Sequence, residues 1–527
     1  MKDKTSVMMR NTIKFNLAND ETESHISDQL AMHHQMKKET TISGQLTYYD
    51  TFDWRLFNKS LVLFTFQNKL ILRKLGEDRI IHSLNAKPVP CFIWEFPKGD
   101  LKRYLEPVIK MRRLLKLVNL VSCTIPYRVL NQDQKTVARL LFETIRTSSR
   151  KNPKTIGSQL WLKPVKGYPK LSKKIKSLLE SIGLTSSRDE DVFLRAISEA
   201  GRDPGSYSSK LRLKLTPDMR ADEATIIIWQ FLFQVIKINE AQIKHDIDTE
   251  ILHDFRVAIR RTRSALVWNK SIFSERIIAR FKKNFSFVGK ITNDLRDLDV
   301  YLLDKPKYKA MLPAVLREDI DPLFDYLGKQ RSVSFRKVIR SLNSNKYRKI
   351  MQGWEAFLNE PQHDLASGSN AEVPVLELAR KRIYKQYRDV IKTGTRILEN
   401  CDDEKLHKLR IQCKKLRYLV QFFSNLFPPK KISLLVGQLK MLQDMLGNHN
   451  DLSVQVNYLL KVAEKMPANL SQSNKTLIAI GSLIGKLETK RKSVKKSFTK
   501  TFTHFSSPPN QKLFRELFAL QSEKVFS

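Results

Sequence analysis

The chain has 527 residues, enough for two or three domains with cores of their own. Hydrophobic residues make up 41% and glycines number only 17, which excludes a disordered chain and favours a helix-rich globular protein. The net charge of +40 comes from 94 lysines and arginines against 54 acidic residues. Such a field attracts polyanions, namely nucleic acid, an anionic membrane or polyphosphate.

The four cysteines are scattered and form no CxxC pair, which argues against a disulfide scaffold or a zinc finger and fits a reducing compartment. The first 20 residues lack the apolar core of a signal peptide. No apolar run reaches about 18 residues, the length that a membrane-spanning helix needs. We therefore expect a cytoplasmic protein with no membrane span.

Residues 1–200 carry strand signals. The segments "LVLFTF" (61–66) and "KLILRKL" (69–75) flank Gln67-Asn68, which predicts a hairpin. "CFIWEF" (91–96) is a further predicted strand, and "VARLLFETI" (137–145) fits either a strand or a helix. "KLSKKIKSLLESIGL" (170–184) has the apolar spacing of a helix. The breaker-rich stretch "RDPGSYSSK" (202–210) marks a boundary, and we assign residues 201–215 to a linker.

Helical periodicity dominates residues 216–527. Thr216 followed by Pro217 predicts a helix start, with the threonine as N-cap, and this helix should continue to about Glu240. Its apolar stretch "TIIIWQFLFQVI" (225–236) is typical of a buried helix. The polar segment 359–374 is a predicted loop that divides the region into two halves, about 216–358 and 375–527.

Each half contains one strongly basic segment, "LHDFRVAIRRTR" (252–263) and "LHKLRIQCKKLR" (406–417). An offset of 154 residues places His253, Arg256, Arg260 and Arg263 on His407, Arg410, Lys414 and Arg417. The same offset places Leu252, Phe255, Ile259 and Leu266 on Leu406, Leu409, Cys413 and Val420. Related stretches follow, "NDLRDLDV" (293–300) and "DMLGNHNDL" (444–452), and we interpret the second as one residue longer. The repeat predicts two similar helical bundles.

On a helix, the aligned basic residues of each segment fall within about 80° of one another, and the apolar residues lie opposite. Arg261, Lys408 and Lys415 widen the basic side. Like charges one turn apart cost a few tenths of a kcal/mol per pair, and no acid four residues away relieves them. Arginine binds phosphate oxygens in two-point fashion. A solvated surface helix would explain one such segment, but the repetition favours a site for an external polyanion.

Both segments resemble the CHAD family, the conserved-histidine α-helical domain, over roughly residues 205–527. The resemblance implies an all-α domain of two pseudo-symmetric four-helix bundles whose basic helices face a shared groove. It also implies binding of inorganic polyphosphate and association with polyphosphate granules. The residues that we expect to bind polyphosphate are His253, Arg256, Arg260, Arg261, Arg263, Arg296, His407, Arg410, Lys414, Lys415, Arg417 and Lys440.

The N-terminal part is similar to the CYTH, or triphosphate-tunnel, family through "YYDTFDWRLFNKSLVLF" (48–64) and "LKPVKGYPKL" (162–171). This resemblance implies an α+β domain with a tunnel-like antiparallel sheet. The family holds its metal with Glu-x-Glu-x-Lys on the first strand, but the best match, residues 10–14, keeps only Lys14. Phe64 and Phe66 replace arginines that the family usually carries. We therefore expect a degenerate domain with no catalytic residue, metal or cofactor. Lys14, Arg73, Lys74, Arg112 and Arg113 remain as residues that could hold anions.

Other functions remain open. The charge also suits a nucleic-acid-binding protein, although the basic segments lack the interleaved aromatic residues that stack on bases. Residual triphosphate hydrolysis by the N-terminal domain is a third function. His253 and His407 could chelate a metal with Asp299 or Asp451, or carry phosphohistidine chemistry, and we interpret His449 as a helix-terminal residue. Lys381, Lys385 and Arg388 could add anion contacts or form a solvated face. We expect other phosphate polyanions as further partners, and neither a membrane nor a specific nucleic acid.

Overall fold

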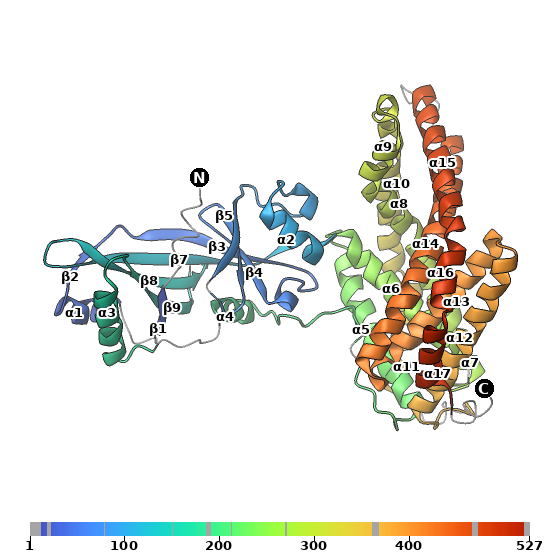
Figure 1. Ribbon diagram of the computed structural model, residues 1–527, viewed down its shortest axis with the longest axis horizontal. Coiled ribbons are helices and arrows are strands. Elements are labelled where there is room, and N and C mark those ends of the chain that lie inside the picture. The colour runs from blue at the N-terminus through green and yellow to red at the C-terminus, as the bar shows by residue number, and fades with distance from the viewer. Residues whose placement is uncertain are drawn as a thin grey trace. The chain divides into compact units, whose positions relative to one another are not determined.

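The computed structural model describes residues 12–17, 23–77, 79–149, 151–185, 191–211, 213–268, 271–360, 368–465 and 473–520. The chain divides into two compact units, Met1–Ser208 and Ser209–Ser527 (Figure 1). The division falls inside the segment 201–215 that the sequence assigns to a linker. A mainly β N-terminal unit is followed by an all-helical C-terminal unit, which confirms the predicted fold class.

The N-terminal unit is a curled antiparallel half-barrel sheet. Its described strands lie in the order β1-β9-β8-β7-β3-β4-β5-β6, and β2 pairs with β7. The strands are β1 (Ile13–Leu17), β2 (Gln35–Lys38), β3 (Ile42–Thr51), β4 (Leu61–Phe66), β5 (Lys69–Lys74), β6 (Ile80–Asn85), β7 (Leu114–Leu130), β8 (Thr136–Thr147) and β9 (Thr155–Pro164). The helices of this unit are α1 (Glu23–Ala31), α2 (Asp100–Ile109), α3 (Pro169–Ser181) and α4 (Val192–Glu199).

The elements predicted for the N-terminal unit are confirmed except for one strand. The hairpin is confirmed, because Gln67 and Asn68 join β4 to β5 with φ angles of 49° and 65°, the positive values that a tight hairpin turn requires. The ambiguous segment 137–145 is a strand, since β8 pairs with β7 on one side and β9 on the other. The helix predicted at 170–184 is α3. The predicted strand at 91–96 is wrong: Glu95 accepts hydrogen bonds from the backbone of Cys91 and Phe92 and closes a short 3₁₀ turn.

The C-terminal unit repeats the same helices after 154 residues. Helices α5 (Ala221–Ile243), α6 (Thr249–Trp268) and α7 (Glu275–Ile291) correspond to α12 (Val375–Glu399), α13 (Asp403–Phe422) and α14 (Pro429–Lys465), and each begins 154 residues before its counterpart. The first half continues with α8 (Asn293–Leu303), α9 (Lys305–Met311), α10 (Asp321–Leu342) and α11 (Asn345–Asn359). The second continues with α15 (Ser473–Lys496), α16 (Phe498–Phe505) and α17 (Pro508–Phe518).

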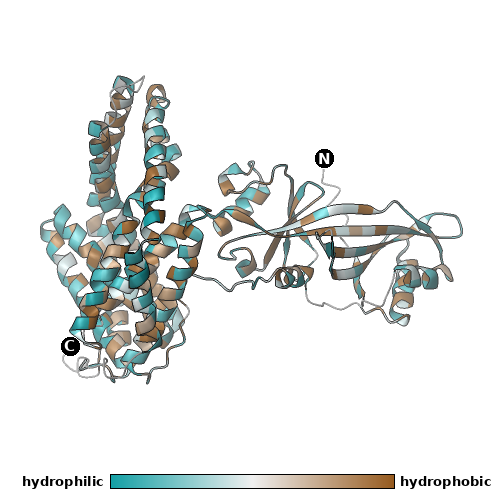
Figure 2. Cartoon of the chain, turned by 180° about the vertical axis from the view of Figure 1, so that it is seen from behind, coloured by the Kyte–Doolittle hydropathy of each residue, from teal (hydrophilic) through white to brown (hydrophobic). Residues whose placement is uncertain are grey.

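The two halves share a hydrophobic core at the protruding end of the unit, where α8, α9 and α10 lie beside α14 and α15 (Figure 1). Leu298 and Tyr301 of the first half pack in one buried cluster with Leu452, Leu459 and Leu483 of the second. The rings of Tyr301 and Tyr458 stack at 4.4 Å between centroids. Brown and teal residues alternate around the helices in Figure 2, as expected for helices with one buried side.

Two helix predictions need correction. Helix α5 begins at Ala221 rather than after Thr216, because Met219 N donates to Thr216 O in a turn and Ala221 N donates to Val373 O. His449 is not a helix-terminal residue. It lies inside the continuous helix α14, where its side chain is buried. The predicted loop 359–374 falls partly outside the described residues. Within the described part of the chain, no helix combines the length and apolar character needed to cross a membrane.

Candidate functional site

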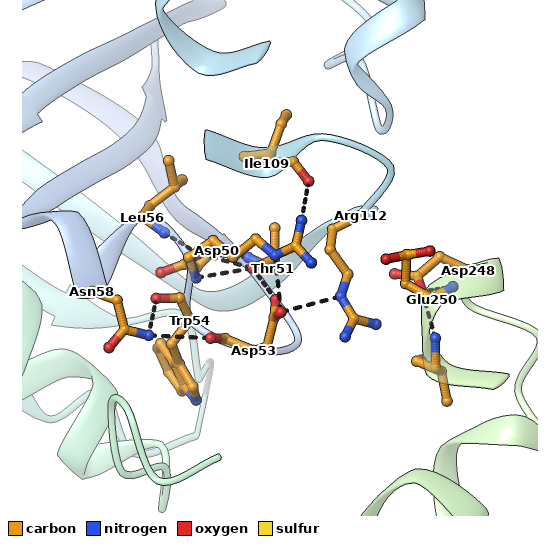
Figure 3. Close-up of polar contacts among 12 residues, drawn as sticks. Asp50, Thr51, Asp53, Trp54, Leu56, Asn58, Ile109, Arg112, Asp248 and Glu250 are labelled. Atoms are coloured by element: carbon orange, nitrogen blue, oxygen red, sulfur yellow. Dashed lines mark hydrogen bonds and ion pairs between the residues drawn. The ribbon is translucent and has the colours of Figure 1, made fainter. Parts of the chain in front are cut away.

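The two basic helices bury the side that the sequence predicts. Helices α6 and α13 have their aligned apolar residues fully inside the unit, each no more than 4% exposed. These residues are Leu252, Phe255, Ile259, Leu266, Leu406, Leu409, Cys413 and Val420. Because the apolar side packs in the core, the cations lie on the opposite side of each helix, at or near the surface. The start of α6 is capped by Asp248, whose carboxylate accepts the backbone N–H groups of Glu250 and Ile251 (Figure 3).

Helices α6 and α13 are neighbours, and their basic sides meet. Arg261 of α6 donates to Gln421 Oε1 of α13 at 3.2 Å, and the rings of Trp268 and Phe423 pack edge to face at 5.2 Å. Burial lowers the pKa of Lys414 on α13 to about 8, and the charge of Arg260 on α6 contributes to the same shift. Cations separated by 154 residues in sequence therefore share one electrostatic environment.

We call this surface the basic front and define it by Arg260 and Arg263 of α6 with Arg410, Lys414 and Arg417 of α13. Arg260 and Arg263 are exposed, and the three cations of α13 are half-buried. In the described part of the chain, no ion pair neutralises Arg260, Arg263, Lys414 or Arg417. The outlying predicted residues Lys415 and Lys440 are exposed and also lack an ion pair among the described residues.

Two carboxylates lie beside the basic front and come from helices that follow it. Asp451 of α14 pairs with Arg410 at 3.2 Å. Burial lowers the pKa of Arg256 to about 10, and the charge of Asp297 on α8 opposes that shift. Arg256 and Arg410 are 154 residues apart, and so are Asp297 and Asp451. The second repeat therefore has no inserted residue between these positions, contrary to the expectation that its stretch 444–452 is one residue longer. No acid lies four residues from the aligned arginines and lysine on the same helix, as expected, but carboxylates of neighbouring helices approach them.

Three of the expected phosphate-binding arginines also hold the fold together. Arg256 donates to Thr292 Oγ1 and Asn293 Oδ1, both at 2.9 Å, where α7 gives way to α8. Arg261 donates to Ser209 O at 3.1 Å, and Arg296 donates to Thr249 O at 3.2 Å. Since a guanidinium has five N–H donors, these bonds occupy only part of each group.

His407 is exposed and oriented by a neighbour that the sequence did not single out. Its Nδ1 lies 2.8 Å from Asn450 Oδ1, while the Asn450 amide donates to Asp451 Oδ1 at 3.3 Å. This arrangement assigns the proton of neutral His407 to Nδ1 and leaves Nε2 as the second contact atom. His253 is half-buried in the first repeat. Asn450 belongs to the segment "GNHND" of the repeated stretch 444–452, so the repeat could have identified it as a candidate site residue.

The metal alternative finds no support in the residues described. No group of three histidine, cysteine, aspartate or glutamate side chains is placed to hold an ion there. Asp299, one expected ligand, is buried and accepts a hydrogen bond from Arg331 Nε at 2.7 Å. His449 lies 3.5 Å from Asp403 beside a cluster of cations, and burial lowers the pKa of its imidazole.

The cations expected to hold anions in the N-terminal unit are largely engaged elsewhere. Arg73 forms a two-point ion pair with Asp191, with both contacts at 2.6 Å. Asp191 is 118 residues from Arg73 in the sequence and caps α4. The sequence around Arg73 therefore could not predict this ion pair. Lys74 pairs with Glu77 at 3.3 Å.

The other expected cations of this unit also have partners. Arg112 is fully buried, and its Nε lies 3.3 Å from Asp53 Oδ2 (Figure 3). Arg113 lies over the ring of Phe92, and Lys14 lies over that of Trp161. Carboxylates or aromatic rings therefore accompany each of these cations.

The loop around Asp50 explains part of that arrangement (Figure 3). Asp50 is buried and accepts the backbone N–H groups of Thr51, Leu56 and Phe57 at 2.6 to 2.9 Å. Burial raises the pKa of Asp50 to about 7. Burial also acts to raise the pKa of Asp53, but the charges of Arg112 and Arg55 together with hydrogen bonds from Arg55 and Thr51 outweigh it, and the net shift is downward. This aspartate pair therefore organises a loop.

Two helical repeats that each present one basic helix define a domain built around a cationic surface. Residues 227–460 match the CHAD domain family. This part of the chain is a CHAD domain, and it contains both α6 and α13. The N-terminal half-barrel sheet is similar in fold to a candidate adenylate cyclase.

Similar proteins are distant. Uncharacterized proteins from two strains of Mycobacterium tuberculosis are 22% identical over 299 residues, 54% of this chain and 56% of each relative. The chain thus spans about half the length of the curated relatives it matches. The CHAD domain from the plant Ricinus communis is 23% identical, with 55% of this chain and 96% of that chain covered and a TM-score of 0.46. A candidate adenylate cyclase from Bacillus halodurans is 13% identical, with 35% and 95% covered and a TM-score of 0.26.

Proposed function

We propose that the basic front binds inorganic polyphosphate and does so without catalysis. The observation that carries the proposal is the meeting of Arg260 with Arg410 and Lys414, because burial and Arg260 lower the pKa of both residues of α13. The fold holds these like charges together at a cost. A linear chain of condensed phosphates would relieve that cost, since guanidinium and ammonium groups bind phosphate oxygens through charge-assisted hydrogen bonds.

Within the described structure, the basic front lacks exposed aromatic side chains on which bases could stack, which favours polyphosphate over single-stranded nucleic acid as its ligand. Proteins that bind single strands place aromatic side chains in the path of the bases. Among the described residues of the C-terminal unit, the well-exposed large hydrophobic side chains are all aliphatic. Tyr418, next to Arg417, is buried. The surface therefore offers charge without rings, which suits a polymer that has no bases.

The N-terminal unit supports the non-catalytic part of the proposal. Its first strand offers Lys14 without the paired carboxylates that a divalent metal requires, and Arg73 is neutralised by Asp191. We propose that this unit no longer hydrolyses triphosphate. Association with polyphosphate granules would follow from binding by the CHAD domain. Metal-dependent release of phosphate from triphosphate by the purified chain would contradict the non-catalytic assignment.

The test compares two double variants that lose the same charge from different faces. Arg260→Ala with Lys414→Ala removes two cations of the basic front. Lys381→Ala with Lys385→Ala removes two exposed cations from the side of α12 opposite its buried residues. Binding of labelled long-chain polyphosphate is titrated at one fixed salt concentration, because affinity for polyanions falls steeply with salt. Circular dichroism checks that the helices are retained.

We expect the front variant to bind at least about tenfold more weakly, since each lost charge-assisted contact is worth roughly 1.5 kcal/mol or more. The α12 variant should stay within about threefold of the unmodified chain. Equal losses in both variants would mean that only net charge matters and would refute the proposed site. Preferential displacement of polyphosphate by single-stranded DNA would favour the nucleic-acid function instead.

A further inference from the structure

Lys414 occupies an unusual position for a lysine. It lies one helical turn after Arg410 and one turn before Arg417, and Arg260 of the neighbouring helix α6 acts on it as well. Its side chain is half-buried, and no hydrogen bond or ion pair holds its ammonium group among the residues described. The carboxylate that acts on it, Asp451 of α14, is paired with Arg410. The positive charges of three arginines therefore act on one amine.

Partial burial beside other cations favours the neutral, nucleophilic form of the amine. Burial, followed by the charges of Arg410 and Arg260, lowers the pKa of Lys414 to about 8. Roughly a quarter of a lysine with that pKa is neutral at pH 7.5, against about 0.1% of an ordinary lysine. Desolvation near other cations is a known way to activate a lysine for covalent chemistry.

We propose that Lys414 is a site of acylation by acyl phosphates, small anionic acyl donors of which acetyl phosphate is the simplest. The lysine nitrogen attacks the carbonyl carbon of the donor, and the bond between that carbon and the phosphate oxygen breaks. Inorganic phosphate leaves with the electron pair, and the nitrogen loses its proton to solvent. The guanidinium groups of Arg260, Arg410 and Arg417 hold the phosphate and stabilise it as it departs.

The repeat restricts this chemistry to one of the two helices. The residue that corresponds to Lys414 in the first repeat is Arg260, whose guanidinium is not an amine nucleophile. Acylation replaces an ammonium group by a neutral amide and thus removes one cation from the middle of the basic front. The resulting loss of polyphosphate binding rests on the proposed function, whereas the acylation itself does not.

The experiment incubates the full chain with acetyl phosphate at pH 7.5 and follows each modified lysine by peptide mass spectrometry. Lys408 and Lys415 of the same helix are exposed and serve as internal controls. We expect the initial rate at Lys414 to be at least about tenfold higher than at either control. Arg260→Gln should lower the Lys414 rate several-fold, through loss of both phosphate binding and pKa depression, and leave the Lys408 rate unchanged.

A second donor separates anion recognition from plain reactivity. The N-hydroxysuccinimide ester of acetic acid is uncharged, so its preference for Lys414 over Lys415 should be smaller than that of acetyl phosphate. Equal rates at Lys414 and Lys415 with acetyl phosphate would overturn the proposed site. Equal preferences with the two donors would overturn the assignment of an anionic donor class. Neither result depends on polyphosphate binding, so the failure of this proposal is distinct from that of the proposed function.

Discussion

Replacing Lys414 by methionine should stabilise the protein while it weakens polyanion binding. Folding lowers the pKa of this lysine from 10.5 to about 8, chiefly through burial. A shift of that size corresponds to about 3.4 kcal/mol against the charged form. Because the side chain is only half-buried, solvent screening leaves roughly half of this penalty. Lys414→Met keeps the apolar stem, so we expect the free energy of unfolding to rise by about 1 to 2 kcal/mol at pH 7.

The pH dependence of that difference provides an internal check. The folded state binds fewer protons at Lys414 than the unfolded state between pH 8 and 10.5, so the stability of the unmodified chain rises with pH across this window. The advantage of Lys414→Met should therefore be full below pH 8 and smaller at pH 9.5. Urea unfolding followed by far-ultraviolet circular dichroism measures it, with exposed Lys415→Met as a control expected within about 0.5 kcal/mol of the unmodified chain. Lys414→Met that is no more stable than Lys415→Met would refute the reasoning.

Two further predictions concern pH and packing. Polyphosphate should raise the pKa of Lys414 on binding, so affinity should be maximal below pH 8 and fall as pH rises through 8 towards the bound pKa. Lys414→Arg should flatten this fall in titrations at constant salt, and an unchanged slope would exclude Lys414 as its source. Gly394→Ala should destabilise the C-terminal unit by about 1 to 3 kcal/mol, because a Cβ there would lie 1.9 Å from Phe502 Cε2. Gly437→Ala, with open space around it in α14, should instead stabilise by about 0.5 to 1 kcal/mol in the same thermal or urea unfolding measurements.

Periodic features of the sequence predicted the helical unit well. The spacing of Leu252, Phe255 and Ile259 gave the buried side of α6 because one helix determines which residues share a face. The internal repeat extended this to α13 and placed Arg260 and Lys414 at equivalent positions. Strands β4 and β5 followed from the hairpin signal at Gln67-Asn68, whose turn is local. These successes share one property, since each depends on residues close together in the chain.

Features that depend on distant residues were missed. Arg73 is neutralised by Asp191 and Arg410 is paired with Asp451, and neither partner lies within one helical turn of the cation. The start of α5 is set by a hydrogen bond from Ala221 to Val373, which the apparent N-cap Thr216 could not reveal. The strand predicted around Ile93 failed because Glu95 bonds the backbone just before it. Tertiary partners override local preference at the first three of these places, whereas Glu95 acts locally on the turn that precedes it.

The interleaved core of α8, α10, α14 and α15 has a consequence for assembly of the basic front. Leu298 and Phe324 lose their neighbours if the second repeat is absent, and Leu452 and Leu483 lose theirs without the first. Neither repeat alone can remove this apolar surface from water, so the halves must fold together. Synthesis of a single repeat would leave this surface in water, and we expect it to yield an unstable product. We therefore expect that one cationic helix alone does not persist as an independent, weaker competitor for an anionic ligand.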